Sequence, residues 1–119
     1  MSHIHEFGKL GEELAVKYLI ANGFSILRCN YRYRKAEIDI IARKDGILAI
    51  VEVKSRRGGF YESISDTISI KKRNLLVMAA DHYVLDNDLD VEVRFDIITI
   101  LNDASGIKIE HFPDAFYHF

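Results

Sequence analysis

The chain has 119 residues, of which 49% are hydrophobic and 29% charged, with one cysteine and a formal net charge of −2. This length predicts a single domain spanning residues 1–119, with no room for a second core. No run approaches the roughly 18 apolar residues that cross a bilayer, and the N-terminus lacks an apolar signal region, so no membrane partner and a cytoplasmic location are expected. The lone Cys29 excludes an internal disulfide, which is typical of a reducing compartment.

The small net charge conceals an uneven distribution. Residues 28–73 hold 12 Lys and Arg against 6 Asp and Glu, whereas the rest of the chain holds 4 against 12. Polyanion binding depends on a local basic surface more than on the total charge. The basic half is therefore expected to bind nucleic acid, with a functionless asymmetry as the alternative.

The first predicted element is a helix over residues 7–22, because apolar residues recur there at helical spacing. Its stripe consists of Phe7, Leu10, Leu14, Tyr18 and Ala21. A strand over 24–31 follows, and then a polar connection over 30–35 in which tyrosines alternate with Arg32, Arg34 and Lys35. Such cations contact phosphates, and such tyrosines can stack on bases. An ordinary charged surface loop is the alternative.

Residues 37–54 predict a β-hairpin whose turn is Asp45-Gly46, a strong hairpin signal. If Lys44 faces Ile47, then Asp39 faces Glu52 and Glu37 faces Lys54. Side chains alternate along strands, so one face is expected to be apolar throughout: Ile38, Ile40, Ala42, Ile47, Ala49, Val51 and Val53.

The opposite face carries all four charged residues at the open end of the hairpin. Facing carboxylates repel each other, and a hard divalent cation such as Mg²⁺, which takes oxygen ligands, would relieve the repulsion between Asp39 and Glu52. The alternative is a solvated rim with a Glu37–Lys54 ion pair.

After the hairpin, Arg56 and Arg57 precede two glycines and predict a mobile basic loop. A helix within 66–86 carries Lys71 and Lys72 near its start, where cations oppose the helix dipole and a bound phosphate would offset that cost. Exposed lysines without a ligand are the alternative. Strands are predicted over 91–101 and 107–112, and Asp96 in the first of them is expected to be structural. The aromatic tail 116–119 is expected to pack back on the body or on a second copy in a homodimer.

The order helix, three strands, helix, two strands predicts an α/β fold with a mixed central sheet flanked by helices. Asp39 followed by Glu52-Val53-Lys54 on the next strand resembles the signature of the PD-(D/E)XK nuclease superfamily, which has the restriction-endonuclease-like fold. The chain resembles most closely the YraN-like family of small bacterial proteins, which are similar to archaeal Holliday junction resolvases. The matching positions are Gly8, Gly11-Glu12, Ala15, Tyr18-Leu19, Gly23-Phe24, Asn30-Tyr31-Arg32, Glu37-Ile38-Asp39, Glu52-Val53-Lys54, Arg56, Lys71 and Phe95-Asp96. The chain departs from the family pattern at Ala36, where glycine is usual, and at Gly59-Phe60-Tyr61, where a Phe-Gly pair is usual.

The resemblance implies metal-dependent hydrolysis of phosphodiester bonds in DNA, including branched or single-stranded structures. Asp39 and Glu52 would hold one or two Mg²⁺ or Mn²⁺ ions, helped by Glu12 and by the Val53 carbonyl. Lys54 would position or deprotonate the attacking water, and Glu37 would orient Lys54. Periodicity alone does not choose between Glu12 and Glu13; the resemblance favours Glu12.

Two other functions remain open from the sequence. The same scaffold would serve as a non-catalytic nucleic-acid binding module, which predicts salt-dependent DNA binding without cleavage. A hydrolase of other phosphate esters would instead turn over small phosphoesters. The complete set of Asp39, Glu52 and Lys54 favours the nuclease over the binding module, which has no need of all three.

Overall fold

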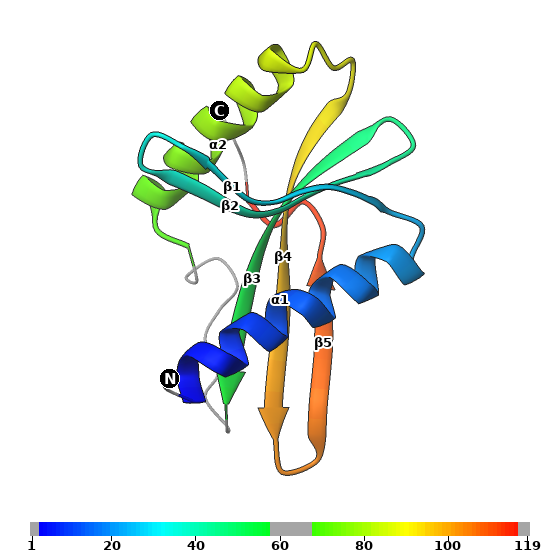
Figure 1. Ribbon diagram of the computed structural model, residues 1–119, viewed down its shortest axis with the longest axis vertical. Helices are drawn as coiled ribbons and strands as arrows, with labels where there is room; N and C mark the ends of the chain where they lie inside the picture. The colour runs from blue at the N-terminus through cyan, green and yellow to red at the C-terminus, as the bar shows by residue number, and fades with distance from the viewer. Residues whose placement is uncertain (1–2, 58–67, 117–119) are drawn as a thin grey trace.

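The computed structural model describes residues 3–57 and 68–116, and the side chains of residues 8–56 and 68–116. The predicted Gly-rich basic loop after Arg57, the Arg57 side chain and tail residues 117–119 lie outside these ranges. Within these ranges, two helices and five strands follow in the predicted order (Figure 1). They are α1 (His3–Ala21), β1 (Ser25–Tyr33), β2 (Ala36–Lys44), β3 (Ile47–Arg57), α2 (Ile70–Asp86), β4 (Glu92–Asp103) and β5 (Gly106–Phe112).

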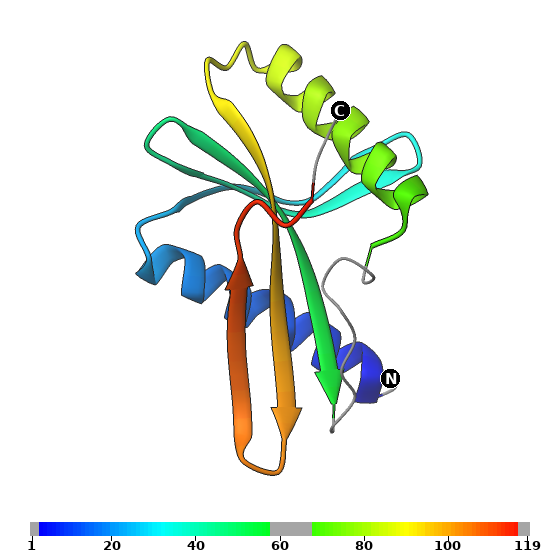
Figure 2. The same cartoon turned by 180° about the vertical axis from the view of Figure 1, so that it is seen from behind.

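The five strands form one mixed sheet in the order β1-β2-β3-β4-β5. All neighbouring strands are antiparallel except β3 and β4, which are parallel and are joined by the α2 crossover. The helices lie on opposite sides of the sheet, as both views show (Figures 1 and 2). The protein therefore has an α/β fold consistent with the restriction-endonuclease-like architecture, as the sequence predicts.

Helix α1 packs closely on the sheet because small residues face it. Its buried positions are Gly11, Ala15 and Leu19, whereas Leu10 is 42% exposed. The buried stripe therefore lies one residue C-terminal to the predicted stripe, because close packing on the sheet favours Gly and Ala over larger apolar side chains. The helix also begins at His3, before the expected start at residue 7. Among the described residues, no helix is long and apolar enough to cross a membrane.

Strand β1 extends to Tyr33, so most of the predicted polar connection is strand. Tyr33 pairs with Ala36, and the turn consists of Arg34, at φ 55°, and Lys35. Tyr31 is 8% exposed and packs edge-on against Tyr83 of α2, with ring centroids 5.2 Å apart. Tyr33 stacks on His82 at 3.9 Å. The prediction that these tyrosines serve nucleic acid was wrong for Tyr31, because burial against α2 covers it.

The hairpin turn and its register are confirmed, but only up to a defined point. Pairs run from Lys44–Ile47 to Ile40–Val51, and there the β2–β3 ladder ends. Beyond it β2 remains paired with β1, whereas β3 continues along β4 as far as Arg57. The predicted facing pairs of Asp39 with Glu52 and of Glu37 with Lys54 are therefore not formed in the ladder, because the two strands diverge.

The divergence also reverses the faces of β2. Ile38 packs in the core under α2, whereas Ile40 packs in the core under α1, so the prediction of one continuous apolar face was wrong at Ile38. In the β1–β2 register Asn30 lies opposite Asp39, and Asn30 has a left-handed φ of 54°. A left-handed residue within a strand turns the strand sharply, which explains the change of face at this level.

Asp96 on β4 is structural, as the sequence suggested. Its side chain is fully buried, and its two oxygens accept hydrogen bonds from Arg94 (2.9 Å to each oxygen), His111 Nε2 (2.8 Å) and the Asp114 N–H (3.1 Å). Burial by itself would raise the pKa of Asp96, but these hydrogen bonds together hold it below its ordinary value. The carboxylate is thus ionised and joins β4, β5 and the C-terminal segment.

The C-terminal segment packs back on the body as far as the structure describes it. The Ala115 N–H donates to the Phe95 carbonyl at 2.7 Å, and the Phe116 ring lies 5.2 Å from that of Phe95. Phe116 is only 6% exposed. Of the two predicted arrangements of the tail, packing on the body is confirmed for Phe116.

Substituting Asp96→Ala should lower the free energy of unfolding by about 3–5 kcal/mol at pH 7, because it leaves the Arg94 cation without its buried partner. Urea denaturation of the variant and of the exposed control Asp90→Ala measures this difference. A loss in Asp96→Ala no larger than that in the control would contradict a structural role for this carboxylate.

Candidate metal and nucleic-acid site

The predicted acids lie in the wedge where β2 and β3 separate. Asp39 occupies the first position of β2 beyond the ladder, and its Oδ2 accepts a hydrogen bond from the Val53 N–H at 2.8 Å. Glu52, on β3, is 5% exposed and points toward the start of α2. The structure therefore brings Asp39, Glu52 and the Val53 backbone together, as the sequence predicts.

The two carboxyls strongly influence each other's ionisation. Burial, hydrogen bonding with the Glu52 carboxyl and the negative charge of Glu52 raise the pKa of Asp39 to about 8, and the Val53 N–H only partly opposes this. Adjacent buried carboxyls share a site in this manner when no cation separates them. At neutral pH without metal, Asp39 thus holds a proton.

Glu12 lies near Asp39 and Glu52 and extends from α1, which packs on the face of the sheet opposite α2. Gly11 permits this approach: a Cβ atom added there would overlap the Ser55 Oγ of β3. Partial burial, followed by the charges of Glu37 and Glu52, raises the pKa of Glu12, and Glu12 in turn contributes to the raised pKa of Asp39. Within residues 3–57 and 68–116, however, no group of three or more His, Cys, Asp or Glu is placed closely enough to hold a metal ion.

Lys54 is half-buried two residues beyond Glu52. Burial lowers its pKa, and the positive charges of Lys72 and Arg56 add to this effect, against the opposing charges of Glu52 and Asp39. The Glu37 Oε2 atom pairs instead with Arg32 Nε at 2.8 Å. The predicted role of Glu37 in orienting Lys54 is not supported by this geometry, because strand divergence gives Glu37 a different partner.

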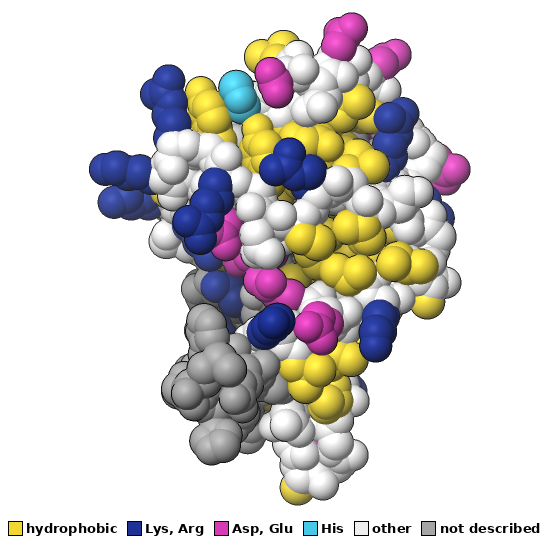
Figure 3. Space-filling model, viewed as in Figure 1, with side chains coloured by type: hydrophobic (Ala, Val, Ile, Leu, Met, Phe, Trp, Pro, Cys, Tyr) yellow, Lys and Arg dark blue, Asp and Glu magenta, His cyan; other side chains and the backbone are white. Residues whose placement is uncertain are grey.

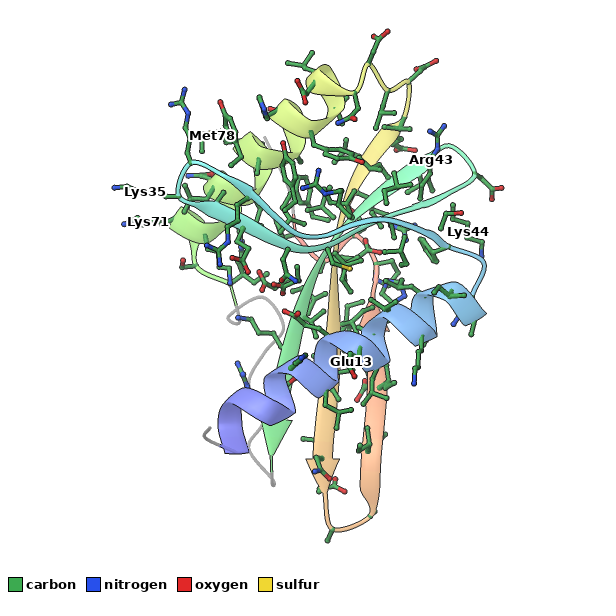
Figure 4. All side chains as sticks on the ribbon, viewed as in Figure 1. Glu13, Lys35, Arg43, Lys44, Lys71 and Met78 are labelled. Atoms are coloured by element: carbon green, nitrogen blue, oxygen red, sulfur yellow. The ribbon has the colours of Figure 1, made fainter. Side chains whose placement is uncertain are left out.

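A pocket of about 330 Å³ opens between the β1–β2 turn and the start of α2. It is lined by Lys35, Ala36, Glu37, Asp39, Ser69, Lys71, Lys72, Leu75 and Leu76. Three of the predicted nucleic-acid ligands thus meet beside Asp39, and Figure 4 shows Lys35 and Lys71 pointing outward at the same edge. On the face shown in Figure 3, Lys and Arg side chains gather around acidic ones in this region.

The other predicted basic residues are placed around this pocket in different ways. Arg32 is held by Glu37, and the Arg34 guanidinium lies 5.4 Å from the centroid of the Tyr33 ring. Arg56 Nη1 donates to the Ser55 carbonyl at 3.2 Å and lies close enough to affect Lys54. Among the pocket lysines, Lys72 also contacts a predicted metal ligand, because its Nζ lies 3.0 Å from Glu52 Oε2.

Ser69 also lines the pocket, although it was not identified from the sequence. Ser69 is the N-cap of α2, and its side chain accepts a hydrogen bond from the Lys72 N–H at 3.1 Å. A serine directly before a run of helix-forming residues is a recognised start signal. It would have placed the helix start at Ile70 and Lys72 within the first turn.

The contact between α1 and β3 predicts opposite effects for two similar substitutions. Gly11→Ala should destabilise the fold by about 1–3 kcal/mol through overpacking against Ser55, whereas Gly8→Ala, where nothing lies within 4 Å, should stabilise it by up to about 1 kcal/mol. Thermal unfolding of both variants, and of Gly11→Ala combined with Ser55→Ala, measures the contact. If removing the Ser55 hydroxyl recovers none of the loss, the contact does not limit the position of α1.

The raised pKa of Asp39 predicts a pH dependence of stability in EDTA. Between about pH 4 and pH 8 the folded state binds a proton that the unfolded state has lost, so the free energy of unfolding falls as pH rises, by at most about 1.4 kcal/mol per pH unit. Asp39→Asn should remove this fall. Urea denaturation across that range measures it, and an unchanged slope in Asp39→Asn would contradict the assignment.

Comparison with known proteins places the chain in a family. Residues 11–100 match the model of the "Uncharacterised protein family UPF0102". The chain is 50% identical over 119 residues to a UPF0102 protein of Flavobacterium psychrophilum and 49% identical to one of Christiangramia forsetii, with both chains covered completely in each case. It is 39% identical over 117 residues to one of Bacteroides thetaiotaomicron, covering 98% of this chain and 97% of that protein. The chain therefore belongs to the UPF0102 family, the YraN-like group that its motifs resemble.

Proposed function

We propose that the protein is a metal-dependent deoxyribonuclease that hydrolyses phosphodiester bonds in DNA. The observation that carries this proposal is the pair of adjacent carboxyls, half-buried Asp39 and buried Glu52, beside the half-buried amine of Lys54 and a basic pocket. Two acids and an amine, placed here just beyond the end of the β2–β3 ladder, are groups that can serve metal-assisted phosphodiester hydrolysis. Branched or single-stranded DNA is the substrate class implied by the family resemblance.

The donor set suits Mg²⁺ or Mn²⁺. Both ions prefer oxygen ligands, and Mg²⁺ often uses only one or two carboxylates together with water and substrate phosphate. Asp39 and Glu52 would supply these carboxylates, with Glu12 and the Val53 carbonyl as further oxygen ligands. Glu52 Oε2 fits this role because it is buried without a hydrogen bond; its 3.0 Å approach to Lys72 is an ion pair that lacks hydrogen-bond geometry. A bound ion would acidify water and neutralise charge that develops on the phosphate.

The chain's own residues would divide the remaining work. Lys54, whose pKa is lowered, would take the proton of the attacking water as the water oxygen bonds to phosphorus and the ester oxygen leaves. Lys35 and Lys71 would hold the phosphates on either side of the reacting linkage, because both line the pocket next to Asp39.

A non-cleaving nucleic-acid binding module is the second candidate. It is favoured by the contact between Lys72 and Glu52, which neutralises the buried acid without a metal ion. It shares the basic pocket with the nuclease and predicts DNA binding that weakens steeply with salt. The two candidates differ in whether a divalent metal ever leads to cleavage.

The deciding experiment incubates the purified protein with linear, single-stranded, flap and four-way DNA in Mg²⁺, Mn²⁺ or EDTA. Cleavage in either metal and none in EDTA is expected. Salt-dependent binding with no product from any substrate would establish the second candidate instead.

Three variants test the assigned roles. Asp39→Asn should abolish cleavage while the fold is retained. Lys54→Met should lower turnover by about 10²–10⁴-fold, the usual contribution of general acid–base catalysis, with a smaller change in Mn²⁺ affinity. Lys108→Met, an exposed lysine on β5, is the matched control and should cleave normally. Full activity of Lys54→Met would remove this lysine from the mechanism.

A further inference from the structure

Lys72 occupies a position where a lysine is electrostatically unfavourable for the helix. It follows the N-cap Ser69 by three residues, in the first turn of α2, which contains no acidic residue. The N-terminal end of a helix carries partial positive charge, so a cation there costs stability. Another interaction must therefore hold the ammonium group in place.

That interaction is with Glu52 of β3. The Glu52 side chain is 6% exposed, whereas that of Lys72 is 41% exposed, and Nζ lies 3.0 Å from Oε2. Because Oε2 has no hydrogen bond, the ammonium supplies charge compensation without completing the coordination of the carboxylate. A buried carboxylate compensated in this incomplete way remains available to a better cation.

The surroundings provide a second place for the ammonium. Lys72 lines the same pocket as Asp39, Lys35 and Lys71, and the Lys72 side chain is partly exposed there. Lysine is a flexible, strongly hydrated point charge that pairs readily with phosphate. Rotation about its side-chain bonds would carry Nζ from the carboxylate to an anion bound in the pocket.

We propose that Lys72 acts as an exchangeable counter-cation: it neutralises Glu52 in the metal-free protein, is displaced when a divalent ion binds, and then pairs with a phosphate of the nucleic acid. This inference rests on the proposed function and adds a positioning residue to it. Because coupling between two binding events is reciprocal, phosphate that draws Lys72 away from Glu52 also favours metal binding. Metal and DNA thus bind with positive cooperativity through one side chain.

Metal binding without DNA is the first test. Calorimetric titration with Mn²⁺ should show about three- to tenfold tighter binding by Lys72→Met than by the wild type, because the competing ammonium is gone. The control is Lys108→Met, which removes an exposed lysine on β5 and should change the Mn²⁺ affinity less than about twofold. Lys72→Arg keeps a cation and should bind Mn²⁺ no more tightly than the wild type.

Cooperativity is the second test. A cleavage-resistant phosphorothioate DNA should tighten Mn²⁺ binding by the wild type, and this gain should shrink by about threefold or more in Lys72→Met. Circular dichroism confirms that each variant is folded, and Lys72→Gln replaces Lys72→Met if the latter does not fold.

The outcomes separate this inference from the nuclease proposal. If the wild type cleaves DNA but Lys72→Met binds Mn²⁺ no more tightly than Lys108→Met, Lys72 is not a counter-cation and the nuclease proposal stands. An equal gain from DNA in both the wild type and Lys72→Met would overturn the proposed transfer to phosphate. A wild type that neither binds Mn²⁺ nor cleaves DNA would overturn both proposals.

Discussion

The end of the β2–β3 ladder at Ile40–Val51 is the constraint on which the rest of the structure depends. Beyond that pair β2 follows β1 toward α2, whereas β3 follows β4, and a wedge opens between them. A buried backbone N–H requires an acceptor. In the wedge, the Asp39 carboxyl accepts a hydrogen bond from the Val53 N–H. A side chain of the candidate metal site therefore also satisfies a backbone donor of the sheet.

Three acidic sites show how unevenly the protein compensates carboxylates. Asp96 has a full set of donors and a lowered pKa, and Glu37 has Arg32 as its partner. Asp39 accepts a hydrogen bond from the Val53 N–H, and Glu52 forms an ion pair with the Lys72 ammonium. The pKa of Asp39 is raised to about 8. The chain can fully satisfy a buried acid, as at Asp96, so the incomplete compensation in the wedge supports the proposed site.

The wedge is completed by both helices. The contact of Gly11 with Ser55 brings α1, and with it Glu12, close to β3. The start of α2 brings Lys72 to Glu52 and Lys71 to the pocket edge. The acids thus come from the sheet and from α1, whereas the lysines that line the pocket come from the β1–β2 turn and from α2. A negative centre bordered by positive charge is suited to a metal ion held against a phosphate.

The sequence by itself determined the order of the elements, the Asp45-Gly46 turn, the register up to Ile40–Val51 and the grouping of Asp39, Glu52 and Val53, because turn chemistry and strand alternation act over a few residues. Tertiary structure decided where the ladder ends, and with it the face of Ile38, the burial of Tyr31 and the partner of Glu37. It also placed the partly exposed Lys72 side chain against Glu52. These outcomes depend on which strand or helix each segment packs against. Such contacts join residues far apart in the sequence, so local sequence patterns do not predict them.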